Sequence, residues 1–189
     1  MATSRKTTST DSATRKTAAR PTSGATGPDA VALLRADHRR VAALYDQYES
    51  TRSTAKKKAL VATICQELAI HAQVEEEIFY PAVKAALKDK EMVPEAQVEH
   101  ASLKELIAQV KDKEPDGEMF DAKIKVLSEY TKHHVKEEQT EMFPKAQKTK
   151  LDMKALGAQI AARKEELLAS PDLMEAPSTT ALASLGEAA

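Results

Sequence analysis

The stretch HAQVEEEIFYP at residues 71–81 decides the fold, because the same pattern returns as HVKEEQTEMFP at residues 134–144. In each copy a histidine is followed by a glutamate four residues later and by a proline ten residues later. Four residues span about 400° of an α-helix, so the histidine and the glutamate lie one turn apart on nearly the same stripe. Each copy therefore predicts a helix that presents an imidazole and a carboxylate on one face.

Four long helices are predicted from the spacing of apolar residues. These residues recur every three or four positions, which indicates one buried face in each segment. We expect the first helix to begin at Asp29 and the second to be capped by Ser53 or Thr54. Pro94 suits the first turn of a third helix, and the turn at residues 115–117 precedes the fourth.

The second helix contains a proline, Pro81, inside its helical pattern. Proline lacks the backbone N–H and its ring crowds the preceding turn, so we expect the helix to kink or loosen there. Pro144 occupies the same place in the fourth helix. The expected inner face of the second helix consists of Leu60, Ile64, Leu68, His71, Glu75, Ile78 and Ala82.

Four histidines lie at regular distances along the chain. His38, His71, His100 and His134 are separated by 33, 29 and 34 residues. In a helical hairpin of about 30 residues each arm is roughly 20 Å long, so each histidine returns to a similar height. In an up-down-up-down arrangement all four would meet in one central layer. The expected fold class is therefore all-α, an up-down-up-down four-helix bundle.

The predicted layer combines these imidazoles with two carboxylates. A lone histidine on an apolar face is more often a hydrogen-bonded core residue than a metal ligand, which leaves a metal-free scaffold as an alternative. Two buried carboxylates without a cation, however, carry a large desolvation cost. Imidazoles and carboxylates without a thiolate suit iron, manganese or zinc. The candidate ligands, placed around a pair of metal ions, are His38, His71, Glu75, His100, His134 and Glu138.

The segments DHRRVAAL, HAQVEEEIFYP, EHASL and HVKEEQTEMFP resemble the hemerythrin-like family of His-His-Glu (HHE) cation-binding domains. The resemblance covers about residues 29–148 and implies a four-helix bundle with a non-haem di-iron centre. Iron is expected in preference to manganese or zinc. The resemblance also implies that the six candidates occupy the family's ligand positions, with Glu75 and Glu138 as bridges between the two ions.

The sequence departs from the oxygen-carrying hemerythrins at two places. Those proteins have a second histidine one turn from the first on the third helix, whereas Ala96 and Lys104 stand one turn from His100 here. Their last helix places an aspartate five residues after the histidine, whereas this chain has Gln139 there and Glu138 one residue earlier. One nitrogen ligand is missing, and a more open iron favours reactivity over reversible oxygen carriage.

We therefore expect a di-iron protein that handles iron, dioxygen, peroxide or nitric oxide in oxidative-stress defence, with peroxide decomposition as the enzymatic activity to test. The alternatives are a non-enzymatic iron or oxygen sensor and a reversible oxygen-binding module. The physiological ligand and the oligomeric state stay open.

Several other polar residues lie near the candidate ligands in the sequence. We expect His133 on the flank of its helix, with a role as a fifth ligand as the alternative. Glu141 should be exposed, or else a carboxylate near the centre or on an iron-entry route. Tyr130 should pack in the core, with a hydroxyl near the site as the alternative. The residues expected to be solvated charges are Glu76, Glu77 and Glu137, and the residue expected to be a buried small hydrophobe is Cys65.

Charge and composition divide the chain. Residues 1–28 carry a net charge of +4 and few large apolar side chains, so we expect a disordered basic tail. The expected parts after it are a bundle over 29–150, an accessory helix over 151–169 and a disordered tail over 170–189.

The remaining net charge of −5 argues against nucleic acid as a partner of the folded domain. A single cysteine, no apolar run of membrane-spanning length and no signal-peptide core favour the cytoplasm and no membrane.

Overall fold

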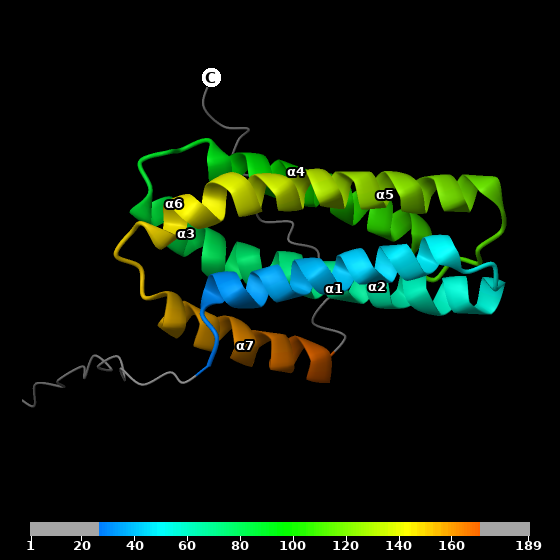
Figure 1. Cartoon of the computed structure of the whole chain (residues 1–189), viewed down its shortest axis with the longest axis horizontal. Coiled ribbons are helices and arrows are strands. Elements are labelled where there is room, and N and C mark those ends of the chain that lie inside the picture. The colour runs from blue at the N-terminus through cyan, green and yellow to red at the C-terminus, as the bar shows by residue number, and fades with distance from the viewer. Residues whose placement is uncertain (1–26, 171–189) are drawn as a thin grey trace, which may run out of the picture.

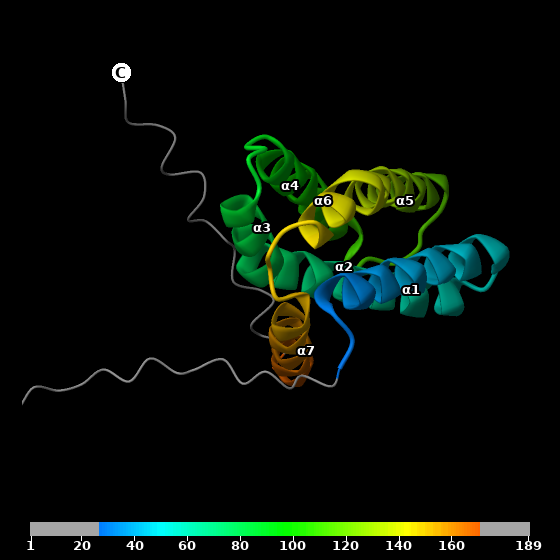
Figure 2. The ribbon, with the colours of Figure 1, turned by 60° about the vertical axis from the view of Figure 1, so that its left-hand side comes forward.

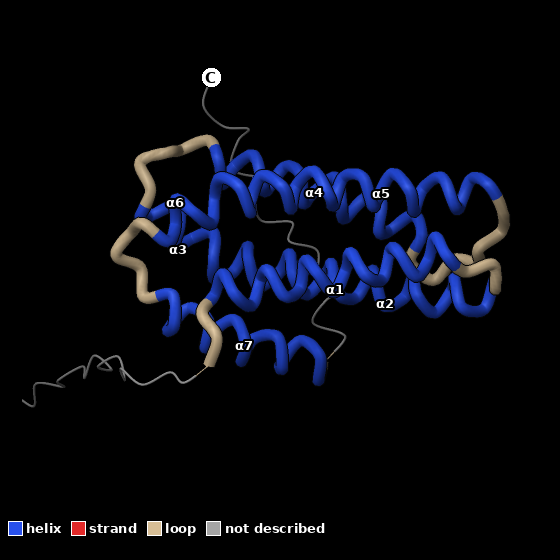
Figure 3. The backbone as a smooth tube through the Cα atoms, in the orientation of Figure 1, coloured by secondary structure: helices blue, strands red, loops and turns tan. Residues whose placement is uncertain are grey.

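The computed structural model describes residues 27–170, and within them it contains helices and loops but no strand (Figure 3). Four long helices run up, down, up and down beside one another (Figure 1). They are α1 (Ala30–Ser50), α2 (Thr54–Val74), α4 (Met92–Val110) and α5 (Glu118–Glu137). The prediction of an all-α four-helix bundle is thus confirmed, whereas most of the two predicted tails lies outside the described residues.

The long helices begin at residues that suit a helix N-terminus. The Asp29 carboxylate accepts a hydrogen bond from the Ala32 N–H at 2.8 Å, and the Ser53 hydroxyl accepts one from Lys56, so both side chains satisfy free N–H groups of a first turn. The third long helix begins at Met92, which leaves Pro94 in its first turn as predicted. Gly117 precedes α5 with φ of 128°, a backbone conformation that favours glycine.

The backbone of α2 and of α5 passes into a wider, π-helical turn at its candidate metal-binding glutamate. One π-helical segment, η1, spans Glu75–Phe79, and the other, η2, spans Glu138–Met142. Each is followed by a short helix that holds the proline in its first turn, α3 (Tyr80–Ala86) and α6 (Phe143–Gln147). Since a proline crowds the turn before it, the predicted loosening takes the form of a wide turn on its N-terminal side.

The wide turn changes which residues face inward. One extra residue in a turn rotates the following helix by about 100° relative to a continuous α-helix. Tyr80 and Val83 are fully buried after η1, whereas Ile78 and Ala82, which the sequence places on the inner face, are only partly buried. The predicted inner stripe is therefore wrong beyond Glu75, because the helical phase is not constant.

Two apolar clusters lie on either side of the polar layer. One contains Leu34, Val74 and Phe143 at the end of the bundle with α3 and α6. The other contains Tyr45 and Leu127 toward the opposite end. Each cluster covers one side of the histidine layer and excludes water from that side.

The last helix, α7 (Met153–Ala169), packs against α1, α2 and η1 along the side of the bundle rather than over one end (Figures 1 and 2). Ile160 and Leu167 are completely buried there. A Cβ at Gly157 would lie 2.5 Å from the Pro28 carbonyl oxygen, so this close approach requires glycine. The division at residue 150 into bundle and accessory helix stays a prediction. None of the helices between residues 27 and 170 has the length and apolarity needed to cross a membrane.

Candidate metal centre

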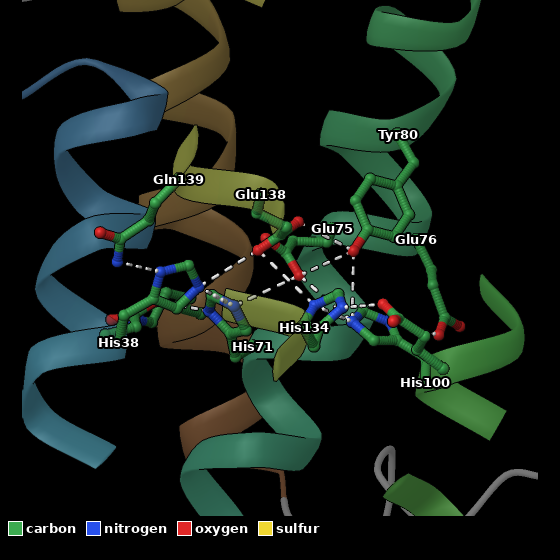
Figure 4. A network of polar contacts seen from close by, with 12 residues as sticks. His38, His71, Glu75, Glu76, Tyr80, His100, His134, Glu138 and Gln139 are labelled. Carbon is green, nitrogen blue, oxygen red and sulfur yellow. Dashed lines mark hydrogen bonds and ion pairs between the residues drawn. The ribbon is translucent and has the colours of Figure 1, made fainter. Parts of the chain in front are cut away.

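The six predicted ligands come together between the four long helices (Figure 4). One histidine comes from each long helix, and the two glutamates begin the π-helical segments. Every one of the six is at most 6% exposed. The set is His38, His71, Glu75, His100, His134 and Glu138.

The imidazoles form two pairs. The Nε2 atoms of His38 and His71 lie 2.9 Å apart, and those of His100 and His134 lie 3.0 Å apart. In each pair, one histidine comes from each of two consecutive long helices of the chain. The arrangement thus offers two positions where nitrogen atoms converge.

Each glutamate lies between the two histidine pairs. Glu75 Oε2 is 3.3 Å from His71 Nε2 and 3.5 Å from His100 Nε2. Glu138 Oε2 is 3.2 Å from His38 Nε2 and 3.5 Å from His134 Nε2. A carboxylate that reaches one histidine of each pair is placed to bridge two cations.

Burial makes these carboxylates costly without a cation. Glu75 Oε1 and Glu138 Oε2 are buried and have no hydrogen-bond partner among the described residues. Burial, together with the nearby Glu138 carboxylate, raises the pKa of Glu75 well above its usual value. Burial opposes ionisation of Glu138 as well, but its close contact with His38, 3.2 Å from Oε2 to Nε2, and the charge of His134 lower its pKa overall. A bound cation would neutralise both groups.

Burial and hydrogen-bond partners shift the pKa values of the histidines in different directions. Burial lowers the pKa of His71 to about 4, which keeps this imidazole neutral at pH 7. Burial likewise lowers the pKa of His100. Burial acts in the same direction on His134, but its hydrogen bond to Glu99 raises the pKa overall.

A further set of polar side chains holds the other ring nitrogen of each histidine. Asp37 Oδ2 lies 3.2 Å from His71 Nδ1, and Glu99 Oε2 lies 2.7 Å from His134 Nδ1. Asp37 immediately precedes His38, and Glu99 immediately precedes His100, so each acid serves the histidine of the next long helix. Such contacts fix the tautomer and the orientation of a ligating imidazole.

The residues that directly follow the two glutamates also hold the second ring nitrogen of a histidine on another helix. Glu76 Oε1 lies 3.0 Å from His100 Nδ1, and the Gln139 side-chain amide lies 3.0 Å from His38 Nδ1. The prediction that Glu76 is a solvated charge is therefore wrong. The sequence signal for all four contacts was a polar residue adjacent to a predicted ligand.

Tyr80 was missed by the sequence analysis. Its hydroxyl donates to Glu138 Oε1 at 3.0 Å and lies 3.3 Å from Glu75 Oε2 and 3.2 Å from His100 Nε2. The equivalent position in the second copy is Phe143, whose ring stacks on His38 at 5.7 Å. The two halves of the site are therefore chemically different. The wide turn of η1 brings Tyr80 inward, and constant helical periodicity does not predict that turn.

Other residues weighed from the sequence lie outside the layer. Tyr130 is 52% exposed, so the prediction that it packs in the core is wrong, and it is Thr131 that is buried. The His133 side chain is 64% exposed on the flank of α5, as expected, and pairs with Glu137. Glu141 is exposed as expected, but it lies within η2. Cys65 is buried.

Comparisons with known proteins identify the family and the fold. Residues 29–146 match the hemerythrin HHE cation binding domain family. A curated relative, described as a DNA nickase from Nostoc sp. (strain PCC 7120 / SAG 25.82 / UTEX 2576), is 26% identical over 111 residues. That alignment includes 59% of this chain but spans only about a third (31%) of the relative's length.

A solved structure shows the same fold. It is the crystal structure of a hemerythrin HHE cation binding domain-containing protein from Mycobacterium kansasii, with a TM-score of 0.66 and 21% sequence identity. The match covers 78% of this chain and 91% of that one. Because the family match includes well over half of the chain, together with all six buried histidines and glutamates of the layer, the protein belongs to the hemerythrin HHE cation-binding domain family.

Proposed function

We propose that the protein holds two non-haem iron ions and that dioxygen, peroxide or nitric oxide reacts at them. One ion would be held by His38 and His71 and the other by His100 and His134, with both glutamates shared. Iron bound there would supply Lewis acidity and redox electrons. The chain would supply the geometry, the imidazole and carboxylate ligands and the apolar packing on either side of them.

The observation that carries this proposal is the facing pair His100 and His134. Both Nδ1 atoms lie at hydrogen-bond distance from carboxylates, 3.0 Å from Glu76 and 2.7 Å from Glu99. A carboxylate only accepts, so each Nδ1 carries the hydrogen and the Nε2 atom of a neutral ring carries a lone pair. Two such atoms 3.0 Å apart repel each other unless a proton or a cation lies between them.

The space beside the layer favours a small ligand. A cavity of about 20 Å³ touches all four histidines and is otherwise lined mainly by apolar side chains such as Val41, Leu68 and Leu103. A volume of this size holds about one water molecule. The cavity therefore supports dioxygen, peroxide or nitric oxide as the ligand, rather than a larger organic substrate.

A second candidate is a non-enzymatic iron or oxygen sensor. Lys164 of α7 contacts Asp37, which in turn contacts His71, so the last helix is linked to the layer through charged side chains. A change at His71 on metal binding would therefore act on the docking of α7. Reversible oxygen binding is the third alternative, and the missing nitrogen on the third helix counts against it.

DNA nicking is not the function that the domain favours, although the curated relative carries that description. Residues 29–189 have a net charge of −5, and carboxylates surround the opening that leads to His134. A phosphate backbone would be repelled there.

Anaerobic reconstitution tests the proposal. Metal-free protein is given ferrous iron, freed of loosely bound iron and analysed for its metal content before exposure to oxygen. We expect two irons per chain and, after oxygen, the near-ultraviolet absorption of an oxo-bridged pair. Catalytic loss of added peroxide supports the defence role, and reversible bleaching on removal of oxygen supports carriage. Wild-type protein that retains no iron contradicts the proposal.

A further inference from the structure

The opening that leads to His134 reaches the layer from the side of α4 and α5. A cavity of about 300 Å³ extends to His134 and Glu138. Lys145, on α6, pairs with two of the lining carboxylates, Asp89 at 3.2 Å and Glu141 at 3.7 Å. The carboxylates that line the cavity besides Glu138 are Asp89, Glu91, Glu95, Glu99, Glu137 and Glu141. With more acids than the one lysine neutralises, the cavity concentrates cations.

A mixed group of potential ligands lies where α4 and α5 meet beside this cavity, and two of its members, Glu99 and Glu137, line it. His133 Nε2 is 3.4 Å from Glu99 Oε1 and 3.3 Å from Glu137 Oε1. One ligand atom from each of the three residues lies within 4.8 Å of the other two. One imidazole nitrogen and two carboxylate oxygens suit a divalent first-row cation, and the exposed side of His133 leaves room for its water ligands.

The charges around Glu99 differ from those around the equivalent acids. Asp37 and Glu76 also hold a ligand histidine, and each also contacts a lysine, Lys164 and Lys104 respectively. The second oxygen of Glu99 instead lies 3.4 Å from Nε2 of His133, an imidazole rather than a lysine ammonium. Glu99 and Glu137 thus present negative charge that a divalent cation would neutralise.

The outer group is also connected to the centre. Glu99 contacts His133 through Oε1 and His134 through Oε2. Glu138, which lines the same cavity, is 98% buried at its side chain and its Oε2 atom has no hydrogen-bond partner. A cation held by Glu99 and Glu137 therefore has its next ligands, His134 and Glu138, in the lining of the same cavity.

We infer that Glu99, His133 and Glu137 form an entry site at which a divalent cation, ferrous iron under the proposed function, binds before it moves to the centre. The inference rests on that proposed function. It assigns to His133 a role distinct from that of the buried histidines, because its side chain is exposed and lies outside their layer.

The rate of metal loading tests the entry site. Metal-free full-length protein is mixed anaerobically with ferrous iron at low ionic strength, and iron not yet bound is trapped with a coloured chelator at successive times. We expect Glu137→Gln to slow loading by about tenfold, the scale of electrostatic focusing, and His133→Ala to slow it because the entry site loses its imidazole ligand. Both variants should still reach the wild-type iron content. Glu105→Gln removes the same charge from an exposed position of α4 and should load at the wild-type rate.

The outcomes separate the two proposals. Loading of both variants at the wild-type rate overturns the entry site alone, and so does a variant that never reaches the wild-type iron content. Wild-type protein that takes up no iron overturns the proposed function and the entry site with it.

A second measurement adds Mn²⁺ to protein whose centre already holds zinc. Selective broadening of the His133 nuclear magnetic resonance signals supports the site, and its absence overturns it.

Discussion

The Tyr80 hydroxyl donates a hydrogen bond to Glu138 Oε1 at 3.0 Å and so joins the two π-helical halves of the bundle across the candidate metal centre. The corresponding side chain of the other half, Phe143, has no hydroxyl and stacks on His38 instead. Because of this difference between Tyr80 and Phe143, the His100 side of the layer has a hydroxyl that can donate a proton, whereas the His38 side has an apolar ring.

Replacement of Tyr80 by phenylalanine should preserve the fold and iron binding but change the reaction with peroxide. The substitution removes one donor from Glu138 without opening a cavity, at a cost of about 1–2 kcal/mol in the free energy of unfolding. We expect a lower rate of peroxide consumption at unchanged iron content. Tyr45→Phe is the matched control, because the Tyr45 hydroxyl is bonded to Thr131 rather than to a candidate ligand. Equal rates in the two variants would contradict a role for the Tyr80 hydroxyl.

Asp37 should strengthen metal binding although it is not one of the six candidate ligands. Its carboxylate holds His71 Nδ1 and contacts Lys164. Asp37→Asn keeps an acceptor but removes the charge, so we expect iron affinity to fall by about tenfold. Competition against a chelator measures the change. Glu165→Gln, an exposed charge change on α7, serves as the control and should leave the affinity intact.

In the metal-free protein, His71 and Glu75 should make pH-dependent contributions of opposite sign to the free energy of unfolding. Since the pKa of His71 is lowered from 6.5 to about 4, the unfolded chain binds more protons than the folded chain in that range, and the free energy of unfolding rises with pH. Glu75, with a raised pKa, makes the free energy of unfolding fall as pH rises above about 4.5.

Glu75→Gln separates the two contributions. Without the opposing carboxyl, we expect the free energy of unfolding of the metal-free variant to rise by up to about 3 kcal/mol between pH 4 and pH 6.5. Urea unfolding at several pH values measures this slope, and the wild-type protein should show a shallower one. A variant slope no steeper than that of the wild type would disprove the assignment.

Gly157→Ala should weaken the docking of α7. The added methyl group would lie 2.5 Å from the Pro28 carbonyl oxygen and 2.9 Å from the Ala30 nitrogen, so the backbone has to move. We expect a loss of about 2 kcal/mol in the free energy of unfolding, measured by thermal or urea denaturation. Gly27→Ala is the control, since nothing lies within 4 Å of a Cβ there. If the two variants are equally stable, the close contact is not tight in solution.

The sequence predicted the bundle and the composition of the layer because both depend on local periodicity. A histidine and a glutamate four residues apart share a face in any α-helix, and similar separations between histidines bring them to one height. His133 was correctly expected on the flank for the same reason. Tyr80 was missed and Tyr130 was misplaced, the first because a wide turn rotates the helix after Glu75.

By itself, the sequence determined that four helices would bring His38, His71, His100 and His134 into one layer with two glutamates, since helix pitch and segment length are properties of the chain alone. Only the tertiary structure decided which acid holds which imidazole. Asp37 reaches His71 and Glu99 reaches His134 because neighbouring helices pack side by side, and hydrogen bonds of about 3 Å depend on that packing. The inward position of Tyr80 is likewise a product of the wide turn and of the core that encloses it.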